Sequence, residues 1–337
     1  MRIEYIDHIK GFAILLVVMG HLIDKSLLLE SSFINKIIYT VHMPLFMYLS
    51  GLFAYKHIIN NLNIKSIFEF VQKKTTRLIL PYITIGGLYA FFKSENLNQL
   101  FIYLNGYWFF PTLFMCMIYG LILINISTLF TKKVHEKYAC YIDCLLFIIT
   151  WGLTIISYYK GYTYSIPYFL SFIKMVPFFS LGYFTTRYEA IQKIVNSNKS
   201  FTIALIIYFA LLCINIKINF KIEGLFAIII VQQLFKKFYL KCPKALSYIG
   251  KNSLEIYSIH WFLLPNLMLM RNLFENTENN IILNNQNLIL LICLTSIIAV
   301  LICYTCIGIA NIIKNSNLLS AIIFGNTKSL TKETNNN

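Results

Sequence analysis

Long apolar runs recur along almost the whole chain and are separated by short polar segments. A transmembrane helix needs roughly 17 to 25 predominantly apolar residues. The pattern therefore predicts an all-α, polytopic helix bundle with about ten spans, near residues 9–29, 34–55, 78–94, 109–130, 139–159, 166–186, 200–216, 222–240, 252–270 and 287–313. One further segment, 97–107, is amphipathic and is expected to lie at the membrane interface.

Composition and charge agree with a membrane protein. Hydrophobic residues make up 58% of the chain and charged residues only 13%, whereas a soluble domain carries about 25% charged residues. The 29 lysines and arginines outnumber the 14 acidic residues, and most of them fall in the two terminal segments and in alternate loops. This asymmetry follows the positive-inside rule, so both termini are expected in the cytoplasm. Membrane topology and anionic lipid headgroups then explain the excess charge, and nucleic-acid binding is not expected.

The first predicted span carries two ionisable residues on one helix face. Lys10 and His21 are eleven residues apart, which returns almost to the same face and separates them by roughly 16 Å along the helix. Ionisable groups inside a membrane are unfavourable and usually face a functional cavity. The alternative is a histidine that bonds a neighbouring helix and only supports packing.

Two other histidines are expected at a similar depth. His42 lies about eight residues into a span that enters from outside, and His260 about eight residues into one that starts inside. Histidine both accepts and donates protons near neutral pH, as a general base must. Each could be an ordinary core histidine, but three at one depth favour catalysis. In that interpretation His42 orients His21, and His260 holds the acceptor or the helix geometry.

Basic residues precede the third predicted span, and two aromatic residues precede the fourth. Lys73, Lys74 and Arg77 can bind phosphate, but they can equally contact headgroups and set topology. Topology is favoured for the two lysines, whereas both interpretations stay open for Arg77, which adjoins the apolar span. On the other side, Tyr107 and Trp108 can stack on a sugar ring or anchor the chain in the interfacial aromatic belt.

Several short motifs follow one another in the order found in a known family. They are Asp7-x-x-Lys10-Gly11 with Gly20-His21, His42-Met43-Pro44-Leu45-Phe46 with Ser50-Gly51, Arg77-Leu78-x-x-Pro81-Tyr82, Tyr107-Trp108-Phe109, Leu181-Gly182-Tyr183, and Ile249-Gly250-Lys251-Asn252-Ser253-Leu254-x-Ile256-Tyr257-x-x-His260. With these motifs the chain resembles the membrane acyltransferase-3 family, in particular its fucose 4-O-acetylase-like branch.

The resemblance implies a membrane O-acyltransferase that moves an acyl group, usually acetyl, from cytoplasmic acetyl-CoA to a hydroxyl of a cell-surface polysaccharide or its lipid-linked precursor. Acetyl-CoA is then a substrate, and no tightly bound cofactor is expected. The family's basic residue and histidine fall on Lys10 and His21, although many relatives have arginine, whose bidentate fork lysine lacks. The candidate site comprises catalytic His21, His42 and His260, donor-binding Lys10 and Arg77, and acceptor-binding Tyr107 and Trp108.

We expect one integral membrane domain over residues 1–325, a polar disordered tail over 326–337, and a location in the cell (inner) membrane. The eight cysteines lack the paired spacing of zinc sites, so no metal is assigned. The competing function is a proton-coupled secondary transporter or flippase, which Lys174 inside a span would also suit. A scaffold without chemistry would leave the histidines unexplained.

Overall fold

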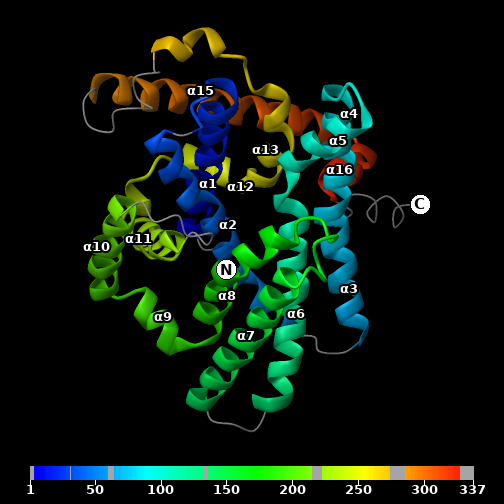
Figure 1. The fold of residues 1–337 in the computed structure, drawn as a ribbon, viewed down its shortest axis with the longest axis vertical. Helices are drawn as coiled ribbons and strands as arrows, with labels where there is room; N and C mark the ends of the chain where they lie inside the picture. Colours follow the sequence, from blue (N-terminus) through cyan, green and yellow to red (C-terminus); the bar gives the residue numbers. More distant parts are fainter. Residues whose placement is uncertain are drawn as a thin grey trace. The chain divides into compact units, whose positions relative to one another are not determined.

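The computed structural model describes residues 4–30, 32–59, 64–131, 136–214, 222–273 and 285–326, and within them it is all-α, without a strand (Figure 1). The chain divides into two compact units. Unit 1 contains residues 1–43 and 231–324, and unit 2 contains residues 44–230 with 325–327. The predicted tail, 326–337, lies outside the described residues apart from Asn326.

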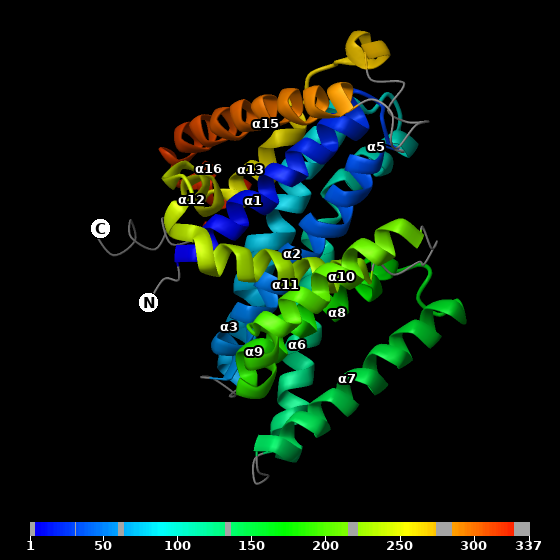
Figure 2. The same ribbon diagram turned by 90° about the vertical axis from the view of Figure 1, so that its left-hand side faces the viewer.

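Unit 1 is built around helix α1 (Glu4–His21), which α12, α13 and α15 contact (Figure 2). Apolar residues point from α1 in most directions, and Ile9, Ile14 and Val17 are buried, as expected for a helix that is hydrophobic all round. The other elements of this unit are η1 (Leu22–Ser26), the first part of α2 (Phe33–Ile59), the last part of α11 (Glu223–Phe238), η5 (Tyr239–Lys241), α12 (Lys244–Lys251), α13 (Ser253–Ile259), η6 (His260–Leu263), η7 (Met268–Leu273), α15 (Asn285–Lys314) and α16 (Asn317–Phe324).

Two glycines allow α1 and α12 to cross at very short range. A Cβ atom on Gly11 would lie 2.0 Å from the carbonyl oxygen of Leu246, and one on Gly250 would lie 1.8 Å from that of Asp7. Real Cβ atoms do not approach a neighbour below 3.0 Å, so any side chain here would push the helices apart. The crossing explains the glycines in two of the sequence motifs, and it fixes α12 and the following α13 against α1.

A hydrophobic cluster holds the turn between η1 and α2. Ile23, Leu27, Ile34, Ile38 and Leu291 are buried in it, so it joins the end of η1 and the start of α2 to α15. η1 itself is a single π-helical turn that follows directly on His21. Such turns are rare and occur often at functional sites. Here the cluster fixes the first residues after α1 against α2.

Unit 2 contains two π-helical turns on either side of Pro81, so that residues 64–93 form one continuous but irregular helical segment. Its elements are the second part of α2, α3 (Ile64–Lys74), η2 (Thr75–Ile79), η3 (Tyr82–Gly86), α4 (Gly87–Lys93), α5 (Leu97–Leu104), η4 (Asn105–Tyr107), α6 (Phe109–Thr131), α7 (Glu136–Tyr159), α8 (Phe169–Arg187), α9 (Glu189–Val195), α10 (Asn198–Ile214) and the first part of α11.

A buried polar network ties α6, α7 and α8 together. The Asp143 carboxylate is fully buried on α7 and pairs with the Arg187 guanidinium at 2.7 Å. Three hydroxyls also donate to this carboxylate, those of Ser127, Tyr183 and Tyr188. Every charge and hydroxyl in the network therefore has a partner, as burial of an ion pair requires.

Six helical stretches are long and apolar enough to cross a membrane: Glu4–Ser26, Phe33–Ala54, Phe109–Phe130, Tyr138–Tyr159, Phe169–Arg187 and Leu288–Lys314. The pair formed by α9 and α10, bent by 58°, would add a seventh. The structure therefore confirms an all-α, multi-pass membrane bundle.

The expected count of ten spans is not confirmed. The predicted span 78–94 contains π-helical turns, 222–240 corresponds to the 16-residue helix α11, and 252–270 loses its helix after Leu263. Pro265 explains this last break, because the residue before a proline disfavours helical geometry, and Leu264 is extended. Hydropathy alone does not detect such interruptions.

Candidate functional site

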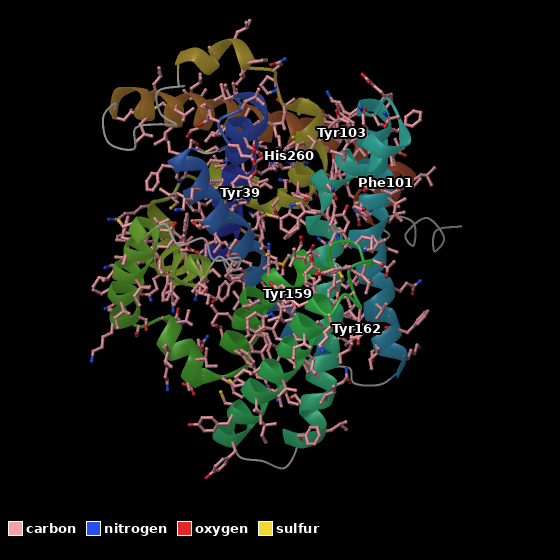
Figure 3. The ribbon with its side chains drawn as sticks, in the orientation of Figure 1. Tyr39, Phe101, Tyr103, Tyr159, Tyr162 and His260 are labelled. Carbon is pink, nitrogen blue, oxygen red and sulfur yellow. The ribbon has the colours of Figure 1, made fainter. Side chains whose placement is uncertain are left out.

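His21 is the last residue of α1 and forms the centre of a cluster of aromatic and imidazole rings in unit 1. It is partly exposed, although its Nδ1 atom is buried and has no hydrogen-bond partner among the described residues. The rings of His260 and Tyr39 flank it, with centroids at 5.4 and 6.5 Å, and the Trp261 ring lies at 4.3 Å. Figure 3 labels Tyr39 and His260. The structure therefore brings His21 and His260 into direct contact.

His260 is fully buried and its protonation pattern is fixed by the backbone. Its Nδ1–H donates to the carbonyl oxygens of Ile256 and Tyr257, at 3.1 and 2.9 Å. A carbonyl only accepts, so the proton is on Nδ1 and the neutral ring carries a lone pair on Nε2. Nε2 is buried and has no partner in the described part of the chain. The ring stacks nearly parallel to that of His21, at 18°.

His42 belongs to a polar stripe on α2. Asn35, Tyr39 and His42 are spaced i, i+4 and i+7, so they share one helix face. The Nδ1–H of His42 donates to the Ile38 carbonyl oxygen at 2.6 Å, and the Tyr39 and His42 rings meet edge to face with their centroids 4.9 Å apart. Tyr39 thus contacts both His42 and His21, and it connects the two imidazoles.

Asp24 is a part of this cluster that the sequence interpretation missed. Its side chain is 8% exposed, and its Oδ2 atom accepts a hydrogen bond from the Tyr39 hydroxyl at 3.2 Å. The ammonium of Lys25, whose side chain is about half-exposed, lies 3.1 Å from the same oxygen. The spacing His21-x-x-Asp24, one helical turn inside an apolar run, is the signal that would have found it.

Lys10 lies on the same helix as His21, on α1, and is partly exposed. α1 is helical throughout this interval, so the rise between the two residues is roughly 16 Å as expected. Lys10 is adjacent to Gly11 and therefore lies at the crossing with α12. The structure places it in the same unit as the histidines, in the first half of α1.

Arg77 lies in unit 2, in the π-helical turn η2, and is exposed. The preceding Lys74 is partly buried, with its ammonium 5.2 Å from the Phe70 ring centroid. Desolvation, together with the positive charges of Arg77 and Lys73, lowers the pKa of Lys74 to about 8. Crowded cations of this kind favour a bound anion, because an anion relieves their mutual repulsion.

Tyr107 and Trp108, the aromatic candidates for acceptor binding, also belong to unit 2. Tyr107 is fully buried, and its ring contacts Tyr89 and Phe110 at 5.9 and 6.4 Å. Trp108 is partly exposed and meets the Phe109 ring edge-on. Tyr107 therefore contributes to the packing of its unit, and its role in acceptor binding stays a prediction, as does that of Trp108.

Together, these contacts describe a partly exposed imidazole supported by buried polar groups. His260 and Tyr39 fix the ring of His21 from two sides, and Asp24 holds the Tyr39 hydroxyl. Of the imidazoles in the cluster, His42 and His260 are buried and His21 is the one that reaches the surface. Such an arrangement can take a proton from a hydroxyl that approaches His21.

The acyltransferase-3 family model, described as an acyltransferase domain, matches residues 3–308. No curated protein and no solved structure matches the chain.

Proposed function

The chain belongs to the acyltransferase-3 family, and we propose that it is a membrane O-acetyltransferase. It moves an acetyl group from cytoplasmic acetyl-CoA to a hydroxyl of a cell-surface polysaccharide or its lipid-linked precursor. The observation that carries the proposal is the partly exposed His21, held between the rings of His260 and Tyr39 at the end of α1. The fucose 4-O-acetylase-like branch and a location in the cell (inner) membrane belong to the same proposal.

His21 acts as the general base. It takes the proton of the acceptor hydroxyl while the hydroxyl oxygen attacks the carbonyl carbon of the thioester. The carbon–sulfur bond breaks, and the protonated His21 then returns the proton to the departing thiolate. The products are an acetyl ester and free coenzyme A. A positioned base of this kind contributes about 10²- to 10⁴-fold to the rate.

The neighbouring residues position this base. The Nδ1–H of His260 is held by two carbonyl oxygens, so the stacked ring keeps one orientation and restrains His21. The Tyr39 ring contacts both His42 and His21, so His42 restrains His21 through Tyr39. His42 and His260 thus act as positioning residues. Precise orientation is necessary because misplacement by about 1 Å costs roughly 10²-fold in rate.

In this proposal, cationic side chains bind the phosphate groups of acetyl-CoA. Arg77 is the candidate in unit 2, and the lowered pKa of Lys74 beside it supports an anion site there. Lys10 is the candidate in unit 1, in the first half of α1 and roughly 16 Å from His21 along the helix. Arginine binds phosphate through a bidentate fork, whereas lysine acts as a point charge.

A transfer assay tests this function. Purified protein in lipid nanodiscs receives acetyl-CoA with a labelled acetyl group and an extract of lipid-linked glycans, and labelled ester is measured. The proposal predicts label on a glycan hydroxyl, and loss of acetyl esters from the surface polysaccharide of cells that lack the gene. A chain that moves solute or glycan across the membrane but transfers no label would instead be a transporter or flippase.

A further inference from the structure

Three buried hydrogen-bond acceptors without donors lie on residues near the end of α1. They are Asp24 Oδ1, Asn35 Oδ1 and His260 Nε2, and no described residue donates to any of them. The Asp24 and Asn35 side chains are only 8% and 3% exposed, and His260 is fully buried. Buried polar atoms almost always have a partner, so three in one place require an explanation.

Each of the three atoms is an acceptor on independent grounds. Asn35 Nδ2 donates to the Glu30 carbonyl oxygen at 3.0 Å, which identifies the other amide atom as the oxygen. His260 carries its proton on Nδ1, because that atom bonds two carbonyl oxygens. Asp24 is a carboxylate that pairs with Lys25 and the Tyr39 hydroxyl through Oδ2 alone. All three atoms can therefore accept hydrogen bonds from a ligand.

The acceptors lie on elements that meet at the end of α1. Asp24 follows His21 by one turn, and Asn35 Oδ1 lies 3.9 Å from the position of a Cβ atom on Gly20, the residue before His21. His260 stacks on His21. A molecule that reaches His21 thus meets atoms that can accept several hydrogen bonds. A sugar carries several O–H donors, whereas a hydrocarbon chain carries none.

We propose that Asp24 and Asn35 form the acceptor subsite beside His21, and that it takes a polyhydroxylated sugar whose hydroxyls donate to Asp24 Oδ1 and Asn35 Oδ1. Tyr39 is the positioning residue of this subsite, because its hydroxyl holds the other carboxylate oxygen. The inference rests on the proposed function, since it assigns the acceptor of the same reaction.

Binding of simple sugars tests the subsite without the reaction. The probes are the methyl pyranosides of glucose, galactose and mannose, and their fully O-methylated derivatives, which keep the ring but lack O–H donors. Saturation-transfer NMR measures their dissociation constants on the protein in nanodiscs, prepared without detergents that carry sugar headgroups. The wild type should bind at least one free glycoside and none of the methylated derivatives.

Matched variants locate the binding. Asp24→Asn should weaken it by about tenfold, because the sugar hydroxyl then donates to a neutral amide oxygen in place of a buried carboxylate. Lys25→Gln removes only the half-exposed ion pair of Asp24, so it should change binding by less than about fivefold. Asn35→Ala gives a second test if Asp24→Asn fails to fold, and it should also weaken binding.

The outcomes separate the subsite from the catalytic proposal. No saturable binding to the wild type, equal binding of methylated and free glycosides, or unchanged binding in both Asp24→Asn and Asn35→Ala would overturn the subsite. If water alone satisfies these acceptors, the last of these results is expected. Glycoside binding that is retained while acetyl transfer is absent would instead refute the enzymatic function and leave the subsite standing.

Discussion

The close crossing of α1 and α12 predicts how far Gly250→Ala would separate the two helices and how much stability it would cost. The new Cβ atom would lie 1.8 Å from the Asp7 carbonyl oxygen, and ordinary contact begins at 3.4 Å, so the helices must separate by about 1.6 Å (3.4 − 1.8 Å). Overpacking of this kind costs about 1–3 kcal/mol, and alanine recovers up to about 1 kcal/mol of helix propensity. The net loss of stability is therefore about 0–3 kcal/mol.

The effect on activity should be larger, because His260 follows ten residues after Gly250 and restrains His21. A displacement of about 1 Å costs roughly 10²-fold in rate, so acetyl transfer by Gly250→Ala should fall by about that factor. Gly308→Ala on α15 is the matched control, because its Cβ atom would meet nothing within 4 Å. Transfer rates and thermal unfolding of both variants are measured in nanodiscs. Equal activity of the two variants would refute the link between the crossing and the site.

Three other predictions concern donor binding and the buried polar network of unit 2. Lys10→Ala and Arg77→Ala should raise the KM for acetyl-CoA more than they lower kcat, because ground-state binding is lost; unchanged KM values would reject the donor site. Lys74, with a pKa of about 8, loses its proton as pH rises, so the KM for acetyl-CoA should increase between about pH 7 and 9 in the wild type and less in Lys74→Gln. The same increase in both proteins would show that Lys74 does not bind acetyl-CoA. Asp143→Ala leaves the Arg187 guanidinium buried without its carboxylate and should destabilise the protein by about 3–5 kcal/mol, whereas Tyr188→Phe, which removes one hydroxyl, should cost about 1 kcal/mol. Unfolding in mixed micelles with increasing dodecyl sulfate measures both, and equal losses would contradict the central role of the ion pair.

The sequence indicated the helical membrane fold and the region of the candidate site. Lys10 and His21 were recognisable because their eleven-residue spacing stays on one helix face, and the depth argument grouped His42 and His260 with His21. The structure places the His260 ring against His21 and connects His42 through Tyr39. The catalytic roles themselves stay predictions.

Other features depend on tertiary contacts that no local pattern shows. Asp24 is a single acid in an apolar run, and its importance depends on the Tyr39 hydroxyl from another helix. Asp143 and Arg187 form a pair from two different helices. The interruptions near Pro81 and Pro265 reduced the number of long helices, because hydropathy measures apolarity and not helical continuity.

The central claim is that His21 is the base of an acetyl transfer. Its most direct test is the rate of labelled acetyl transfer at saturating donor and acceptor, in the wild type and in His21→Ala, with equal helical content and thermal unfolding as the requirement for comparison. We predict that the rate falls by about 10²-fold or more, because general base catalysis contributes about that much. A His21→Ala rate within a few-fold of the wild type would contradict the account.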